Sequence, residues 1–251
     1  MAKGFSESLV SAMRTSNIQS IVSTRVFSLA RKIIGEVFAY RISCRNGVIL
    51  FYDDPARAKV IDLIKQIKDE TEMLLKNNEA YQIFMVVRRT AKIEGDIAEV
   101  GVYHGGSAKL ICEAKNGRSL HLFDTFDGLP DLCEIDNPSQ FCQGKFRATF
   151  EDVKDYLRKY SNVHINKGLF PTTAESIRKK KFSFVHLDVD LYRSTLDCLV
   201  FFYSRMSKGG VIVSHDYINT PGVRKAFDEF FTDKPEPIIE LSGSQCMIVK
   251  T

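Results

Sequence analysis

The sequence predicts an α/β fold with a doubly wound, mostly parallel sheet. From residue 95 almost to the C-terminus, short apolar runs of strand length alternate with segments of helical pattern. Repeated units of this kind form a parallel sheet with helices on both faces. Two short strand patterns around Ser242 and Gly243 close the chain and predict a C-terminal antiparallel hairpin.

Length and composition exclude several classes of protein. The 251 residues, 44% of them hydrophobic, suffice for one large domain with an N-terminal appendage. A net charge of +4 is too small to indicate nucleic-acid binding. No apolar run approaches the roughly 18 residues of a membrane-spanning helix. The six scattered cysteines form no C-x-x-C pair, which favours a reducing, cytoplasmic location over a disulfide framework.

Residues 1–55 are predicted to form a helical appendage. The segment 8–35 contains no acidic residue, and its apolar residues recur at a helical 4-3-4 spacing (Val22, Val26, Leu29 and Ile33). Three interpretations fit this pattern. The helix could serve packing or homo-oligomerisation, it could lie on a membrane surface through residues 8–45, or it could be a cleaved transit peptide.

Residues 56–94 are predicted to be lead-in helices, and the main domain spans 95–251. The helical pattern of 56–89 is interrupted at Asn77 and Asn78, and Gly95 ends it. The elements expected in the main domain are strands at 97–102, 119–125, 162–167, 182–190 and 211–217, helices at 107–114, 150–160, 173–180, 192–206 and 221–231, a turn at 208–210, and hairpin strands at 237–241 and 244–250.

The connection 126–148 is too long for a simple link between two elements. It is rich in Gly, Pro, Asp and Asn. Long connections of this composition are often lids, so we expect this one to order when ligands bind.

The stretch 95–110 combines a buried strand, a tight glycine turn and a helix N-terminus. Such a turn directs backbone N–H groups and the positive end of a helix dipole at one point. Glu99 is unusual there, because a carboxylate in a buried strand is costly without a partner. The spacing Glu-x-Gly-x-x-x-Gly differs from the fingerprint of pyrophosphate-binding dehydrogenases. A ligand with an amine and a sulfonium, such as S-adenosylmethionine, fits this pattern, although a strand–turn–helix without a ligand also explains it.

The next strand, 119–125, ends in a second acid. Asp124 lies roughly 20 residues beyond the glycine turn, the interval at which doubly wound folds place a ribose-binding carboxylate. The alternative is that Asp124 only caps the loop after its strand. Two acids flanking a glycine turn favour the nucleoside interpretation.

Acidic side chains also gather where two later strands end. Asp188 and Asp190 are expected on one side of their strand, and His215 and Asp216 follow the neighbouring strand. In such sheets ligands bind beyond the carboxyl ends of the strands. Carboxylates and an imidazole at this edge suit Mg²⁺ or Mn²⁺, and a bound cation would orient and acidify an acceptor hydroxyl. Two alternatives are that Asp190 caps the following helix, which we favour, and that Asp188 pairs with a basic residue.

The five histidines are expected to differ in role. His121 and His186 lie within apolar strands and are expected to be core residues. His164 is expected to be exposed, and His104 lies in the glycine turn. Only His215, next to an aspartate at a strand end, is a functional candidate.

Separate motifs lie at residues 98–106, 123–130, 167–173, 187–195 and 209–217. Together they resemble the macrocin O-methyltransferase family over roughly residues 70–235. Those enzymes methylate sugar hydroxyls of macrolide antibiotics with S-adenosylmethionine and a divalent cation. The resemblance implies a class I methyltransferase, Rossmann-like fold, which usually ends in an antiparallel hairpin.

The resemblance also implies roles for individual residues. The cation is expected on Asp188, His215 and Asp216, which makes Asp188 a catalytic candidate. The residues expected to bind the cofactor are Glu99, Gly101, Tyr103, Gly105, Gly106, Ser107, Asp124, Thr125 and Gly168.

The sequence departs from the family pattern in the metal ligands and the base. Two adjacent aspartates are expected where this chain has His215 and Asp216, which puts the ligand set in doubt. The loop 131–149 lacks the histidine that the macrolide enzymes use as base. Leu191 stands where related catechol enzymes carry a lysine. The base is therefore unassigned, with His215 as one candidate.

The favoured hypothesis is a divalent-cation-assisted O-methyltransferase that uses S-adenosylmethionine and acts on a hydroxyl of a sugar or related small molecule or glycan. A macrolide acceptor does not follow from the resemblance. The alternatives are a nucleotide-dependent oxidoreductase and a non-catalytic or metal-independent nucleoside-binding protein of the same fold.

Overall fold

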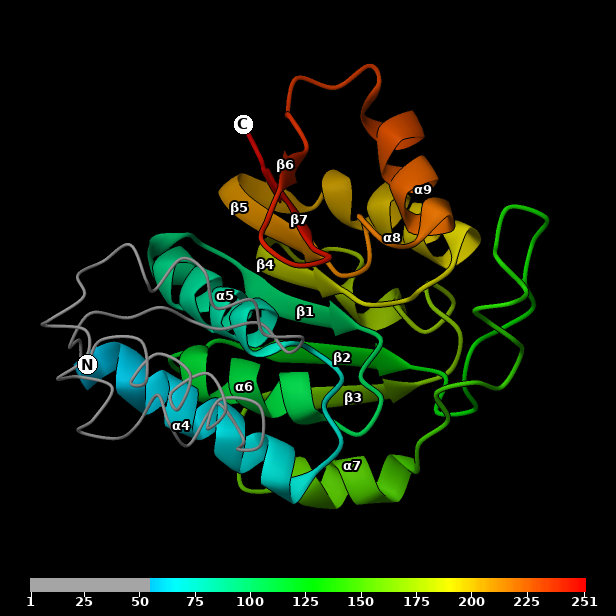
Figure 1. The fold of residues 1–251 in the computed structure, drawn as a ribbon. Helices are drawn as coiled ribbons and strands as arrows, with labels where there is room; N and C mark the ends of the chain where they lie inside the picture. The colour runs from blue at the N-terminus through cyan, green and yellow to red at the C-terminus, as the bar shows by residue number, and fades with distance from the viewer. Residues whose placement is uncertain (1–54) are drawn as a thin grey trace, which may run out of the picture. The chain divides into compact units, whose positions relative to one another are not determined.

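The computed structural model describes residues 55–251. The predicted appendage, apart from Pro55, and the predicted membrane contact of residues 8–45 lie outside the described residues. A seven-stranded sheet with the order β3-β2-β1-β4-β5-β7-β6 forms the centre (Figure 1). The strands β1 to β5 are parallel, and β7 pairs antiparallel with both β5 and β6. The predicted doubly wound sheet with a C-terminal antiparallel hairpin is confirmed.

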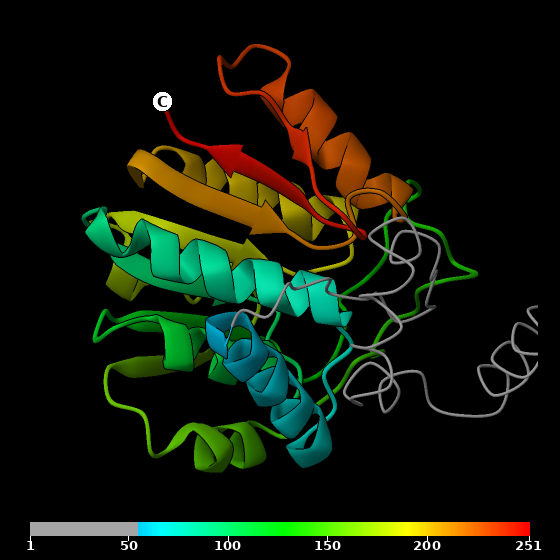
Figure 2. The same ribbon diagram turned by 60° about the vertical axis from the view of Figure 1, so that its left-hand side comes forward.

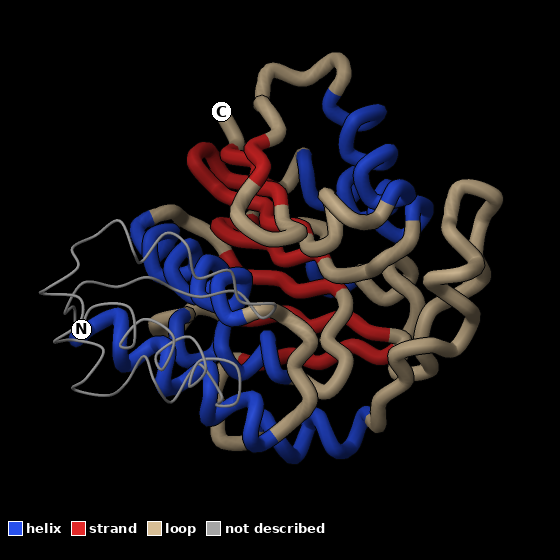
Figure 3. Tube along the Cα trace, viewed as in Figure 1, coloured by secondary structure: helices blue, strands red, loops and turns tan. Residues whose placement is uncertain are grey.

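Helices flank both faces of the sheet (Figure 3). The strands are β1 Asp96–Val100, β2 Leu120–Asp124, β3 Val163–Lys167, β4 Phe182–Leu187, β5 Met206–Ser214, β6 Ile239–Glu240 and β7 Cys246–Val249. The α-helices are α4 Pro55–Glu70, α5 Asn77–Arg89, α6 Gly106–Ala114, α7 Phe150–Leu157, α8 Tyr192–Tyr203 and α9 Pro221–Phe231, and the 3-10 helices are η2 Thr90–Lys92 and η3 Glu175–Ile177. Among these residues no helix is both long enough and apolar enough to cross a membrane.

Alternating side chains of each strand supply two separate cores. In β1, Ile97 packs with residues of α4, α5 and α6, whereas Ala98 and Val100 pack with residues of α8 and α9. This alternation follows from the two-residue period of a strand, and strands buried on both faces read as continuous apolar runs. Because α4 and α5 share the first core with the sheet, the predicted lead-in helices are part of the same compact unit (Figure 2).

The break in the lead-in helices lies at residues 71–76, and the expected break at Asn77 and Asn78 is wrong. Asn77 begins α5, and the side chain of Asn78 donates to the carbonyl oxygen of Ser242 at 2.9 Å. In the first turn, Glu79 accepts a hydrogen bond from the backbone N–H of Lys76 at 2.8 Å. The asparagines therefore mark a helix start that is held by a contact distant in sequence.

Two further boundaries differ from the expectation. The strand β5 begins at Met206 and runs through the glycines that were expected to form a turn. A Cβ on Gly210 would lie 2.9 Å from the Phe182 carbonyl oxygen, and the β4–β5 register shifts there. Gly210 therefore permits the shift in β4–β5 register, because a side chain at this position would clash with the neighbouring backbone. The expected helix at 173–180 is reduced to the 3-10 turn η3.

The long connection 126–148 is folded on itself beside the carboxyl ends of β1 and β2 (Figure 1). Leu129 and Phe141 form a small core with Leu191. The Leu129 N–H donates to the Lys145 carbonyl at 2.8 Å. In the same segment, Asp136 accepts a bond from the backbone N–H at the start of α8, at 2.8 Å. Closure of this segment over a ligand stays a prediction.

A buried ion pair beneath the C-terminal strand provides a test of stability against pH. The fully buried Glu236 carboxylate accepts bonds from Lys250 Nζ at 2.5 Å and from the Tyr203 hydroxyl at 2.8 Å. Burial alone would raise the pKa of Glu236, but these donors hold it at about 2, below the ordinary 4.5. Since the folded pKa is depressed, the stabilisation is present above about pH 4.5 and is lost as the pH falls toward 2.

We expect Glu236→Gln to be less stable than the wild type by up to about 3 kcal/mol at pH 6 and by much less at pH 3. Urea unfolding at both pH values measures this difference. The exposed pair of Glu175 and Arg178 gives the control, since Glu175→Gln should change stability by under about 0.5 kcal/mol at either pH. A Glu236→Gln deficit that stays constant with pH would contradict the assignment.

Candidate functional site

A cavity lies at the carboxyl edge of the sheet, where the glycine turn, the long connection and the ends of β2, β4 and β5 meet. Most residues predicted for cofactor and metal line it. These are Gly101, Tyr103, Gly106, Ser107, Asp124, Thr125, Gly168, Asp188, His215 and Asp216. Glu99 and Gly105 do not line the cavity. One cavity thus brings together residues that the sequence separates by more than a hundred positions.

The end of β1 passes very close to the segment after β4. Gly101 has a φ of +87°, and a Cβ on it would lie 1.8 Å from the carbonyl oxygen of Asp188. Only glycine combines this backbone conformation with such close approach. The glycine therefore places the predicted cofactor turn directly beside the predicted metal ligands.

Asp124 organises the turn after β1 as well as lining the cavity. Its Oδ2 accepts bonds from the backbone N–H groups of Val102 at 2.7 Å and Tyr103 at 2.9 Å. Its Oδ1 accepts a bond from the Phe126 N–H at 2.7 Å. An ionised carboxylate offers about four acceptor positions, so one can still face the cavity. Both predicted roles, the loop cap and the cavity-facing acid, are compatible with this geometry.

Glu99 lies behind the cavity wall, fully buried in β1. Its Oε1 is 2.8 Å from Nδ1 of His186, and burial raises the pKa of the Glu99 carboxyl. Glu99 Oε2 and His186 Nε2 have no hydrogen-bond partner among the described residues. His121, bonded to Asp96 at 2.9 Å, is also buried, so the prediction of two core histidines is confirmed.

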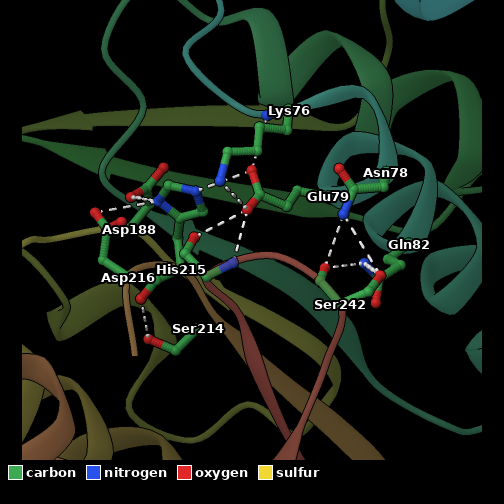
Figure 4. Close-up of polar contacts among 10 residues, drawn as sticks. Lys76, Asn78, Glu79, Gln82, Asp188, Ser214, His215, Asp216 and Ser242 are labelled. Atoms are coloured by element: carbon green, nitrogen blue, oxygen red, sulfur yellow. Dashed lines mark hydrogen bonds and ion pairs between the residues drawn. The ribbon is translucent and has the colours of Figure 1, made fainter. Parts of the chain in front are cut away.

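Three predicted metal ligands that line the cavity form a cluster. Asp188, His215 and Asp216 offer ligand atoms that all lie within 4.8 Å of one another. His215 Nδ1 is 3.2 Å from Asp188 Oδ1 and 3.2 Å from Asp216 Oδ2 (Figure 4). Burial alone would lower the pKa of His215, but Asp188 and the other surrounding carboxylates outweigh it and raise that pKa far above its ordinary value. The surrounding carboxylates thus favour the protonated form of the ring.

The expectation that Asp190 caps helix α8 is wrong. The strand β4 ends at Leu187, and Asp190 adopts a left-handed φ of +60° that turns it into the cavity. The N–H that starts α8 is capped instead by Asp136, as described above. Burial, and then the charges of Asp188 and Asp216, raise the pKa of Asp190 well above its ordinary value. Asp190 therefore adds a third carboxyl group to the cavity wall beside Asp188 and Asp216.

The sequence did not indicate that Glu79 contacts His215 or that the segment between α4 and α5 contributes to the cavity. Glu79, on the first turn of α5, is 1% exposed and lies 3.4 Å from His215 Nε2. The segment between α4 and α5 supplies Glu72 to Leu75 to the cavity wall. No local pattern indicates either contribution, because a glutamate in a helical stretch reads as a solvated residue.

Comparisons with known proteins agree on one family. The model of the family "Macrocin-O-methyltransferase (TylF)" matches residues 78–244. The chain is 28% identical over 153 residues to demethyldecarbamoylnovobiocin O-methyltransferase of Streptomyces niveus, covering 55% of this chain and 58% of that protein. It is 29% identical over 140 residues to a Streptomyces olivaceus 4'-O-methyltransferase of a rhamnosyl-tetracenomycin, covering 50% and 54%. The chain thus spans little more than half the length of these curated relatives.

The fold of the chain is also similar to that of a solved O-methyltransferase structure. The structure of the O-methyltransferase NovP superposes with a TM-score of 0.66 at 21% identity, covering 78% of this chain and 98% of that one. At this identity the superposition establishes the fold alone. It shows that the sheet and its helices form a class I methyltransferase architecture.

Proposed function

Since the chain belongs to the macrocin O-methyltransferase family, we propose that it transfers the methyl group of S-adenosylmethionine to a hydroxyl of a sugar or related small molecule or glycan, with the help of a divalent cation. The observation that carries this proposal is the shared cavity. The glycine turn and Asp124 line the same cavity as the cluster of Asp188, His215 and Asp216. The family argues against the nucleotide-dependent oxidoreductase considered above.

The cofactor is proposed to bind along the ends of β1 and β2. Asp124 accepts a hydrogen bond from a ribose hydroxyl, and the turn from Gly101 to Ser107 offers backbone donors and a helix N-terminus to the methionine end. Tyr103, Thr125 and Gly168 complete the walls. Gly105 shapes the turn from behind the wall through its left-handed φ of +80°, and Glu99 contacts His186 there.

The cluster fits a divalent cation by its donor set. Octahedral coordination at about 2.1 Å places neighbouring ligand atoms about 3 Å apart, close to the two 3.2 Å separations around His215 Nδ1. Carboxylate oxygens suit Mg²⁺ and Mn²⁺ alike, and an imidazole nitrogen is a ligand typical of transition metals, which makes Mn²⁺ the ion to test first. When bound, the cation supplies Lewis-acid stabilisation of the acceptor oxygen.

The transfer itself is a substitution at the methyl carbon. The acceptor oxygen forms a bond to this carbon, the carbon–sulfur bond breaks, and the sulfonium becomes a neutral thioether. The hydroxyl proton must leave to a base at the same edge of the cavity. His215 is one candidate for that base, but only in a state in which its Nδ1 carries neither a cation nor a proton, and the neighbouring carboxylates favour the protonated ring.

The role of Asp124 is tested by binding of the cofactor alone. We expect Asp124→Ala to weaken S-adenosylmethionine binding about 10- to 100-fold, because a charge-assisted hydrogen bond worth roughly 1.5–3 kcal/mol is lost. Isothermal titration calorimetry measures this change. Asp127→Ala is the control, since Asp127 is exposed, lies three residues away and does not line the cavity. Equal affinity of Asp124→Ala and wild type would refute the role.

A further inference from the structure

Glu79 connects His215 to two distant parts of the chain. Its Oε1 accepts bonds from the Ser244 backbone N–H at 2.8 Å and the Ser244 hydroxyl at 3.0 Å. Its Oε2 accepts the Lys76 N–H at 2.8 Å and lies 3.4 Å from His215 Nε2 (Figure 4). Hydrogen bonds to both oxygens of Glu79 therefore fix the position of its carboxylate beside the imidazole.

The two nitrogens of His215 consequently face different surroundings. Nδ1 faces Asp188 and Asp216 in the cavity, and Nε2 faces Glu79. Glu79 itself does not line the cavity. A carboxylate that accepts the proton of one imidazole nitrogen fixes the ring and leaves the other nitrogen free to bind a ligand.

We propose that Glu79 is a positioning residue that accepts the Nε2 proton of His215 and so directs Nδ1 at the cluster with Asp188 and Asp216. The proposed orientation of the His215 ring follows from contacts between side chains and does not depend on a cation. The consequence for cation affinity rests on the proposed function.

The turn of the C-terminal hairpin is part of this support. Gly243 has a φ of +108°, and a Cβ on it would lie 2.4 Å from Glu79 Oε1. The turn can therefore approach the carboxylate closely enough for Ser244 to donate both of its hydrogen bonds. A purely structural role for Glu79 would account for the bonds from Lys76 and Ser244, but it would not require a contact with the imidazole.

The first test measures the NMR signals of the His215 ring nitrogens and needs no cation. The full chain is labelled with ¹⁵N-histidine, and the His215 ring signals are assigned by their loss in His215→Ala. We expect Glu79→Gln to shift the His215 Nε2 signal and to leave those of the other four histidines in place. Glu236→Gln is the matched control, because it also neutralises a buried, ion-paired glutamate but lies outside the cavity. Unchanged His215 signals in Glu79→Gln would overturn the proposal.

The second test measures Mn²⁺ affinity by electron paramagnetic resonance, without cofactor or acceptor. Loss of a carboxylate that orients a metal-binding histidine typically lowers affinity 10- to 100-fold, and we expect this in Glu79→Gln but not in Glu236→Gln. Wild-type affinity in Glu79→Gln would overturn the proposal while leaving the cation site intact. If the wild type itself binds no Mn²⁺, the proposed cation fails, and the imidazole spectra still decide the role of Glu79.

Discussion

Asp188→Asn is expected to abolish cation binding and methyl transfer together while S-adenosylmethionine affinity stays almost unchanged. The substitution keeps the volume of the side chain and removes one charged ligand of the cluster. Since Lewis-acid stabilisation is worth several kcal/mol, turnover should fall at least about 100-fold. Mn²⁺ titration, calorimetry with the cofactor and transfer of a labelled methyl group measure the three effects.

Two further variants make this result interpretable. Asp197→Asn changes an aspartate on α8 that pairs with Arg193 at 3.0 Å outside the cavity, so all three measurements should match the wild type. His215→Ala separates two roles, because loss of Mn²⁺ binding identifies a ligand, whereas retained Mn²⁺ with lost turnover identifies a base. Normal cation-dependent turnover in Asp188→Asn would contradict the assignment.

Gly101→Ala is expected to be among the most destabilising single substitutions at the site. The added methyl would lie 1.8 Å from the Asp188 carbonyl oxygen, in a backbone conformation with φ of +87°. Backbone strain and overpacking each cost about 1–3 kcal/mol, so we expect a loss of about 2–6 kcal/mol in the free energy of unfolding. Urea denaturation measures it.

Gly117 provides a matched control for that experiment. It has a similar φ of +80°, but a Cβ there would meet nothing within 4 Å. Gly117→Ala should therefore show the strain without the clash and lose about 1 kcal/mol. Equal losses in the two variants would mean that the strand ends do not approach as closely as described.

Local patterns were sufficient to predict the sheet and most of the cavity. The apolar run of β1 and the glycines after it are contiguous, and Asp124 follows at a spacing set by one β-α unit. Asp188 and His215 end neighbouring parallel strands, so topology alone brings them to the same edge. For this reason the sequence could predict that these residues lie together at one edge of the sheet, whereas their roles toward a cofactor and a cation stay predictions.

The predictions were wrong or incomplete for residues whose positions depend on contacts with distant parts of the chain. Asp190 reads as a helix cap because it precedes α8, yet Asp136 from a distant loop takes that position. Glu79 reads as a surface residue, yet packing of α5 against the hairpin turn buries it beside an imidazole 136 residues away. Such pairings leave no periodic signal in the sequence. Homo-oligomerisation and a cytoplasmic location stay predictions.

We have proposed that one cavity binds both the cofactor and a divalent cation, at separate groups of residues. Sequential calorimetry can separate the two binding events, with S-adenosylmethionine titrated into cation-free protein and Mn²⁺ then titrated into the cofactor-loaded protein. We predict two binding events: Asp124→Ala weakens the first and leaves the second unchanged, whereas Asp188→Asn abolishes the second and leaves the first almost unchanged. Failure of the wild type to bind S-adenosylmethionine, or an Mn²⁺ titration that Asp188→Asn leaves unchanged, would contradict it.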